Sequence, residues 1–231
     1  MQFIQTKNPD KGIEEMAGRI TAALHAGRKV FWLVCGGSNI PLAASAITII
    51  AGECSDRELA NLTVGQTDER YGPVGHEDSN WRQMADNGFK FDHVGTLSFL
   101  IGKSLAETAA TYSLKFDEIS GAIAGARGLV IAQFGVGPDG HVAGILPHSP
   151  AVTDISLISG YEGQPYTRLT LTPMAFKRID VAYTFVFGDS KRQAIKSLCE
   201  QDRPIAEEPC QLLKTIPESF LYSDLIPPHA D

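Results

Sequence analysis

Residues 134–141 read FGVGPDGH, a glycine-rich turn that carries an aspartate and a histidine directly after an apolar run. The glycines let the chain turn sharply and expose Asp139 and His141. Histidine titrates near neutral pH, so it can take a proton from water and then return it to a leaving group. A neighbouring carboxylate can hold the ring in place. The stretch therefore predicts a general base, His141, supported by Asp139; a purely structural histidine is the alternative.

The same turn also spells the pattern G-x-G-x-x-G, through Gly135, Gly137 and Gly140. A dinucleotide-binding loop of this kind needs a long helix after the third glycine and an acidic residue about 20 positions further on. Here Pro147 and Pro150 interrupt the segment that follows. The pattern also lies beyond the midpoint of the chain, so we do not expect it to bind a dinucleotide.

A second turn, CGGSN at 35–39, follows another apolar run and precedes a helix that opens at Pro41. Gly36 and Gly37 let the backbone approach a ligand, and the free N–H groups of a helix N-terminus attract anions. Ser38 adds a hydroxyl. The turn therefore predicts an anion site, with an ordinary strand–helix turn as the alternative. It lacks the lysine of a nucleotide-binding P-loop.

Charged residues follow a third apolar run, in the stretch TDERYGP at 67–73. Arg70 offers a planar fork that suits a phosphate or carboxylate, and Asp68 can orient a hydroxyl or move a proton. Whether Asp68 or Glu69 faces the ligand stays open. Lys191, at the start of a helix, and Asn80 are two further candidate ligand contacts. Solvated charged loops are the alternative interpretation of these residues.

The surrounding pattern alternates strands with helices. Helical spacing opens after Pro9, with Asp10 as a candidate N-cap, and a capping box begins at Ser104. Bulky apolar runs predict buried strands. The predicted helices cover 9–26, 41–51, 79–86, 104–121 and 190–199, and the predicted strands cover 29–35, 62–68, 94–100, 128–134, 155–159, 168–172 and 181–187.

This alternation is typical of an α/β fold with a largely parallel sheet flanked by helices. We expect a single domain over residues 1–231, with room for a small subregion after residue 150. Ligands of such sheets bind beyond the carboxyl ends of the strands. The three polar turns should therefore face one crevice.

The composition of the chain limits which partners and which cellular location are expected. The chain has 231 residues, of which 43% are hydrophobic and 20% charged, enough for a sizeable core. The formal net charge of −7 argues against nucleic acid as a partner, and an anionic substrate would need a locally basic pocket. The four cysteines lack metal-site spacing and are expected to be free thiols. Because there is no signal peptide and no membrane-spanning stretch, we expect a cytoplasmic protein.

Taken in order, these motifs resemble the 6-phosphogluconolactonase family, within the larger group that includes glucosamine-6-phosphate deaminases. The matching stretches are CGGS, TDERYGP with SN shortly after, GVGPDGHVAGILP, RLTLTP and GDSKRQAI. The resemblance implies a Rossmann-like fold of the phosphosugar isomerase and lactonase type. It also implies hydrolysis of 6-phospho-D-glucono-1,5-lactone to 6-phosphogluconate in the pentose phosphate pathway. Its partner would be a small phosphosugar lactone, and no metal or organic cofactor is expected.

The sequence departs from the family pattern at two places. Asn39 and Ile40 stand before Pro41, where the family usually has G-G-S-T-P. Gly144 and Leu146 replace the serine and phenylalanine of D-G-H-x-A-S-L-F-P. The first departure affects the anion contacts, and the second removes a hydroxyl near His141.

Two other functions remain as alternatives. A glucosamine-6-phosphate deaminase typically has D-E-Y where this chain has DER, and a glutamate soon after the D-G-H loop where this chain has ILPHSP. A non-catalytic sugar-phosphate-binding protein would have no need for the Asp139 and His141 pair. The lactonase is therefore the favoured interpretation. The sequence gives no oligomeric state.

The favoured mechanism assigns each of these residues a role. The substrate phosphate would sit on the Gly36–Ser38 backbone, with Arg70 and Lys191 supplying positive charge. His141 would remove a proton from water and then return it to the ring oxygen as the ester bond breaks, with Asp139 holding its ring or its loop.

Overall fold

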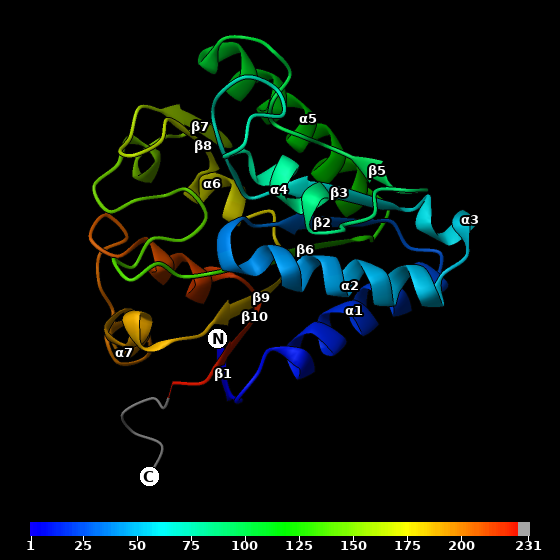
Figure 1. Ribbon diagram of the computed structural model, residues 1–231, viewed down its shortest axis with the longest axis horizontal. Helices are drawn as coiled ribbons and strands as arrows, with labels where there is room; N and C mark the ends of the chain where they lie inside the picture. The colour runs from blue at the N-terminus through cyan, green and yellow to red at the C-terminus, as the bar shows by residue number, and fades with distance from the viewer. Residues whose placement is uncertain (226–231) are drawn as a thin grey trace.

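The computed structural model describes residues 1–225 and is built on a seven-stranded sheet in which all neighbouring strands run parallel (Figure 1). The strand order is β1-β10-β9-β6-β2-β3-β5. A smaller antiparallel sheet has the order β4-β8-β7. The strands are β1 (Gln2–Gln5), β2 (Val30–Val34), β3 (Leu62–Gln66), β4 (Asp68–Arg70), β5 (Gly95–Thr96), β6 (Leu129–Phe134), β7 (Ile158–Tyr161), β8 (Arg168–Leu171), β9 (Val181–Val186) and β10 (Glu218–Ser223).

Helices cover both faces of the parallel sheet, so the predicted α/β class is confirmed. They are α1 (Asp10–His25), α2 (Ile40–Glu53), α3 (Asp56–Leu59), α4 (Asn80–Asp86), α5 (Leu105–Gly125), α6 (Pro173–Phe176) and α7 (Arg192–Glu200). Short 3₁₀ turns occupy η1 (Gly37–Asn39), η2 (Pro150–Val152), η3 (Asp189–Lys191) and η4 (Pro209–Thr215). Figure 1 shows α1 and α2 side by side on one face and α5 on the other.

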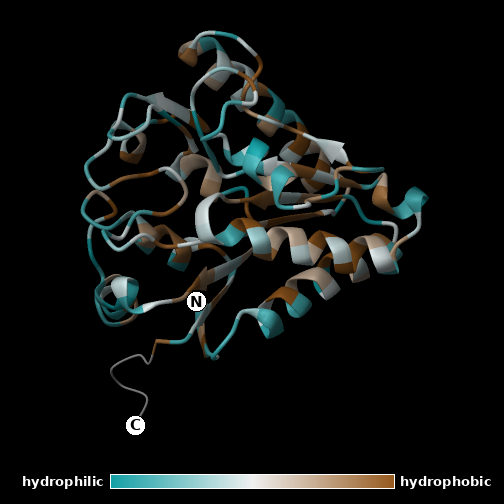
Figure 2. Ribbon diagram, in the orientation of Figure 1, coloured by the Kyte–Doolittle hydropathy of each residue, from teal (hydrophilic) through white to brown (hydrophobic). Residues whose placement is uncertain are grey.

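Strand β2 shows how the sequence builds two cores. Val30, Trp32 and Val34 pack with α1 and α2, while Phe31 and Leu33 pack with α5 on the opposite face. All five side chains are fully buried. Alternate residues of a strand point to opposite faces, so a strand covered on both sides must be apolar throughout. Figure 2 shows this hydrophobic colouring along the central strands.

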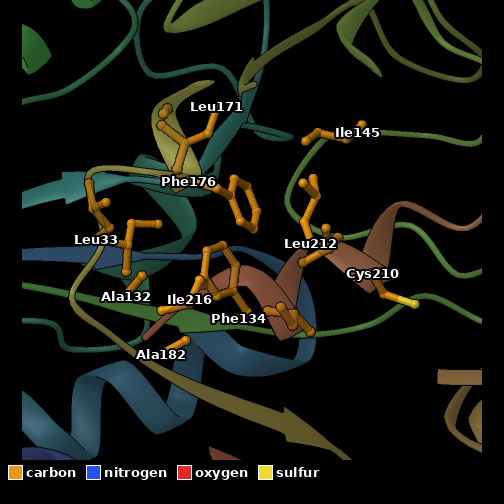
Figure 3. Packing of buried hydrophobic residues seen from close by; sticks show 14 of the residues in the cluster. Leu33, Ala132, Phe134, Ile145, Leu171, Phe176, Ala182, Cys210, Leu212 and Ile216 are labelled. Carbon is orange, nitrogen blue, oxygen red and sulfur yellow. The ribbon is translucent and has the colours of Figure 1, made fainter. Parts of the chain in front are cut away.

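The small sheet packs against the parallel sheet through α6 and the C-terminal segment. Phe176 of α6 stacks on Phe134 of β6, with ring centroids 5.0 Å apart. Leu171 of β8 and Leu212 of η4 lie in the same cluster (Figure 3). This packing brings β4 and β8 to the carboxyl end of β6, where the polar turns emerge.

Most predicted elements are found with small shifts at their ends. Helix α1 begins at Asp10 itself, and Pro9 is its N-cap, so the predicted Asp10 cap is wrong. The capping box at Ser104 is confirmed. The strand predicted at 62–68 ends at Gln66, because the chain leaves the parallel sheet and enters the small one as β4. The strand predicted at 94–100 pairs only at Gly95–Thr96.

The edge strand β1 and its neighbour β10 were missed from sequence. β1 is four residues long, and β10 follows a proline-rich segment that reads as a loop. β10 is an interior strand, paired with β1 and β9. It is recognised by its hydrogen bonds to these two strands rather than by its own sequence pattern.

The four cysteines are free thiols, as predicted. No helix within residues 1–225 is long and apolar enough to cross a membrane.

Candidate active site

A cavity of about 280 Å³ opens at the carboxyl ends of β2 and β6. The small sheet and η3 supply the rest of its wall. This placement is the one expected for ligands of an open parallel sheet. The residues that line it are Cys35, Gly36, Gly37, Ser38, Asn39, Asp68, Arg70, Gly135, Val136, Gly137, Pro138, His141, Ala143, Arg168 and Lys191.

His141 is held by Asp139 at this cavity. The Nδ1 atom of His141 lies 2.6 Å from Oδ1 of Asp139. An ionised carboxylate only accepts hydrogen bonds, so we assign the ring proton to Nδ1, which leaves the Nε2 lone pair free. Partial burial works against ionisation of Asp139, but its hydrogen bond and charge interaction with His141 outweigh this and lower the pKa of the carboxyl. The pair has the arrangement of an oriented general base.

The turn that carries this pair is braced from two sides. The amide of Gly137 donates to the carbonyl of His141, and the amide of Cys210 in η4 donates to the carbonyl of Gly140. A Cβ at Gly137 would lie 2.1 Å from Nδ1 of His141, so only glycine leaves room for the ring. Gly140 has a φ of +81°, which L side chains rarely adopt. The glycines thus shape the turn around the imidazole.

Three cationic side chains line the cavity. Arg70 and Arg168 are directly opposite each other on β4 and β8. Lys191 lies at the end of η3, and burial lowers the pKa of its ammonium. None of the three forms an ion pair with a residue in the range 1–225. Like charges on facing strand positions repel, and all three cations are only partly exposed, so the cavity is complementary to an anion.

The side chains of Asp68 and Glu69 point to different places. Asp68 lines the cavity and accepts a hydrogen bond from the hydroxyl of Thr67. Glu69 is 1% exposed and lies behind the wall. Its two oxygens accept hydrogen bonds from five groups: Gln66 Nε2, Arg70 N, Ser79 Oγ, Asn80 N and Trp81 N. Glu69 therefore anchors the start of α4 to β4.

Replacing Glu69 by glutamine should destabilise the fold. The NH2 group of the glutamine cannot accept hydrogen bonds from the donors that now share a carboxylate oxygen of Glu69. Hydrogen bonds to a charged group contribute about 1.5–3 kcal/mol each. We expect the free energy of unfolding, measured in urea, to fall by about 2–3 kcal/mol. Glu77→Gln, at an exposed position in the same segment, is the control and should change it little. Equal stability of the two variants would contradict the anchoring role.

Asn80 also lies behind the wall rather than in it. It is fully buried, and its Nδ2 donates to the backbone oxygen of Asp68 at 3.0 Å. Its Oδ1 would be 2.0 Å from a Cβ at Gly36, so the bare backbone of the anion turn packs directly on this amide. Asn80 is placed to hold Gly36 and Asp68 in register.

The two departures from the family pattern have structural partners. Asn39 is buried between the strand ends: its Nδ2 donates to the Phe185 carbonyl, and its backbone oxygen accepts from Gln133. At Gly144 a Cβ would lie 2.9 Å from Cβ of Thr170, so a serine has no room. The amide of Gly144 instead donates to the Thr170 hydroxyl at 2.9 Å.

The structure thus brings seven of the nine predicted site residues to one cavity: Gly36, Gly37, Ser38, Asp68, Arg70, His141 and Lys191. Of the other two, Asp139 reaches the cavity through His141, and Asn80 lies behind it. Arg168 was missed as a site residue. It opens the RLTLTP stretch, and a charged residue starting an otherwise buried strand is the signal that could have singled it out.

Comparisons with known proteins match most of the chain. Residues 7–221 match the family model for glucosamine-6-phosphate isomerases/6-phosphogluconolactonase. A 6-phosphogluconolactonase of Mycobacterium tuberculosis is 24% identical over 208 residues, which cover 84% of this chain and 82% of that protein. A crystal structure of a 6-phosphogluconolactonase from Shewanella baltica has a TM-score of 0.74 at 16% identity, covering 96% of this chain and 97% of that one.

A monomeric glucosamine-6-phosphate deaminase superposes equally well, with a TM-score of 0.74 at 16% identity over 96% of this chain and 97% of the other. The shared fold therefore does not separate the two chemistries. That distinction depends on the residues at the cavity.

Proposed function

The chain belongs to the family of glucosamine-6-phosphate isomerases and 6-phosphogluconolactonases, and we propose that within it the protein hydrolyses 6-phospho-D-glucono-1,5-lactone to 6-phosphogluconate. The observation that carries this proposal is the oriented imidazole of His141 beside a cavity lined by three cations that form no ion pair within residues 1–225. The curated relatives that match the sequence are named 6-phosphogluconolactonases, which favours the lactonase over the deaminase. The free cysteines suit the reducing cytoplasm, where we propose that the protein acts.

The substrate phosphate is placed on the backbone of Gly36–Ser38, at the start of α2. Lys191 and Cys35 both line the cavity at this turn. The half-buried ammonium and the helix N-terminus both favour an anion there. Arg70 and Arg168 line the same cavity and supply the remaining positive charge. The acidic protein thereby holds a locally basic site.

Hydrolysis then uses the free Nε2 of His141. The imidazole takes a proton from water as the water oxygen attacks the lactone carbonyl, which gives a tetrahedral oxyanion. The ring C–O bond of that intermediate breaks, and the protonated imidazole returns its proton to the departing ring oxygen. Asp139 keeps the ring oriented and stabilises its transient positive charge. The cations of the cavity are placed to stabilise the oxyanion.

The proposal is tested by generating the lactone in situ and following 6-phosphogluconate formation above spontaneous opening. We expect clear acceleration by the wild-type protein and none above background by His141→Ala. Release of ammonia from glucosamine 6-phosphate would instead establish the deaminase. Binding of 6-phosphogluconate without turnover would establish a sugar-phosphate-binding protein, and both of these results would overturn the proposal.

Replacing Arg168 by methionine should weaken substrate binding without harming the fold. Losing one charge-assisted hydrogen bond to the substrate raises KM about tenfold. Removal of its repulsion with Arg70 should leave the melting temperature equal or higher. Arg178→Met, at a surface ion pair with Asp117, is the matched control and should not change KM. An unchanged KM for Arg168→Met would remove this residue from the substrate site.

A further inference from the structure

Three potential metal ligands meet at the end of the helical layer far from the cavity. They are His25, the last residue of α1, Cys54, directly after α2, and Glu58 of α3. The Nε2 atom of His25 lies 3.9 Å from Sγ of Cys54 and 3.9 Å from Oε1 of Glu58. All three ligand atoms lie within 4.8 Å of one another. His25 is 29 positions before Cys54, which is why cysteine spacing gave no sign of this cluster.

The cluster is separate from the catalytic cavity. Helix α2 begins at the anion turn and ends beside Cys54, and its 14 residues span about 20 Å at 1.5 Å per residue. Figure 1 shows α3 at the opposite end of α2 from the small sheet. What binds here is therefore independent of the proposed lactonase function.

The spacing of the His25 and Cys54 ligand atoms is close to that of a tetrahedral zinc site. Zinc binds cysteine sulfur at about 2.3 Å and histidine nitrogen at about 2.0–2.1 Å. Tetrahedral angles then place the two ligand atoms about 3.6 Å apart. The observed 3.9 Å needs only a few tenths of an ångström of closure. A nitrogen, a thiolate and a carboxylate are ligands that zinc accepts together.

Glu58 is fixed for this role by its helix cap. Its Oε2 accepts hydrogen bonds from the amide and the hydroxyl of Ser55, in the capping box that starts α3. Its Oε1 is the oxygen that faces His25. One oxygen thus holds the carboxylate in place while the other points to the cluster.

The helix ends add negative potential at the same place. Helix α1 ends at His25 and α2 ends at Glu53, and the carbonyl groups at helix C-termini favour a cation. The Glu53 carbonyl oxygen lies 3.1 Å from Nε2 of His25. The hydroxyl of Thr21, which is 4% exposed, lies beside the Cys54 thiol and supplies a further polar group at the cluster.

We propose that His25, Cys54 and Glu58 form a binding site for one zinc-type divalent cation, with water as the fourth ligand. Binding displaces the thiol proton of Cys54 to solvent and moves the single proton of the neutral His25 ring to Nδ1. The cation would join the ends of α1, α2 and α3. Because ligands that bind only the folded state stabilise it, the site would raise stability rather than take part in catalysis.

The test uses the full chain, freed of metal by a chelator and titrated with zinc chloride in a calorimeter. We expect one zinc per chain, with affinity at least about tenfold weaker in His25→Ala, Cys54→Ser and Glu58→Gln. Glutamine still accepts the cap hydrogen bonds, so Glu58→Gln keeps α3 intact. Cobalt chloride should give a thiolate-to-cobalt charge-transfer band that Cys54→Ser lacks.

His93→Ala is the matched control. His93 lies 3.7 Å from Asp56 on the same surface but outside the cluster, so this variant should keep full affinity. Absence of zinc binding to the wild-type chain would overturn the proposal. So would binding of equal affinity in the three ligand variants, because the metal would then sit elsewhere. Lactone hydrolysis is not the readout, so failure of the proposed function leaves this test unaffected.

Discussion

Replacing His141 by alanine is expected to lower kcat for lactone hydrolysis by about 10²–10⁴-fold, the usual contribution of a positioned general base. The variant leaves the cavity and its cations in place, so KM and the binding of 6-phosphogluconate should change much less. The imidazole is partly exposed, with 31% of its side chain accessible, so its loss creates no large core defect. Steady-state kinetics and a binding titration of the same preparation measure both effects.

His148→Asn is the matched control for this variant. His148 lies in the same segment, is exposed and has a φ of +58°, a conformation that asparagine adopts readily. Its kcat should equal that of the wild-type protein. If His141→Ala kept full kcat after the rate of spontaneous opening was subtracted, another group would have to be the general base.

Gly137→Ala is the second change with a large expected effect. The added methyl group would lie 2.1 Å from Nδ1 of His141 and 2.6 Å from Oδ1 of Asp139, so the pair has to separate. A displacement of about 1 Å at a reacting group can lower the rate about 10²-fold, and we expect kcat to fall by that amount. The cation site is untouched, so binding of 6-phosphogluconate should persist.

Gly121→Ala provides the comparison. Gly121 lies within α5, and a Cβ there meets nothing within 4 Å. Alanine in a helix is favoured over glycine by roughly 0.5–1 kcal/mol, so this variant should be slightly more stable and fully active. Full activity of Gly137→Ala would show that the geometry of the imidazole and the carboxylate does not limit turnover.

The sequence pattern predicted those helices and strands whose own residues show a hydrophobic run or a helix cap. The strand that became β6 is a continuous apolar run, and α5 begins with a capping box at Ser104. The stretch at 67–73 is different, because its three strand residues pair with β8 about 100 positions away in the chain. No local pattern reports a pairing of that kind. The second sheet, which sets Arg168 opposite Arg70, could therefore only come from the structure.

The site shows the same division. Asp139 and His141 stand two positions apart in a glycine-rich turn. That spacing predicted their interaction, because a general-base histidine needs its carboxylate partner close by. Sequence could not assign the side of the wall on which Asn80 and Glu69 lie, since a buried anchor and a ligand contact have the same polar side chains. Burial and hydrogen-bond partners separate them: Glu69 has five donors, and Asn80 packs under Gly36.

The pairing of β1 with β10 sets an order of events during synthesis. Strand β1 leaves the ribosome long before β10, which is its neighbour in the sheet within residues 1–225. At about 5–20 residues per second the interval is of the order of tens of seconds. Through that time the central strands can associate, but β1 has no partner. The turn bearing His141 is also completed late, because the Cys210 amide that donates to its Gly140 carbonyl belongs to the same late segment. A nascent chain halted before that segment would have most of its sheet, but the turn bearing His141 would lack its contact with Cys210.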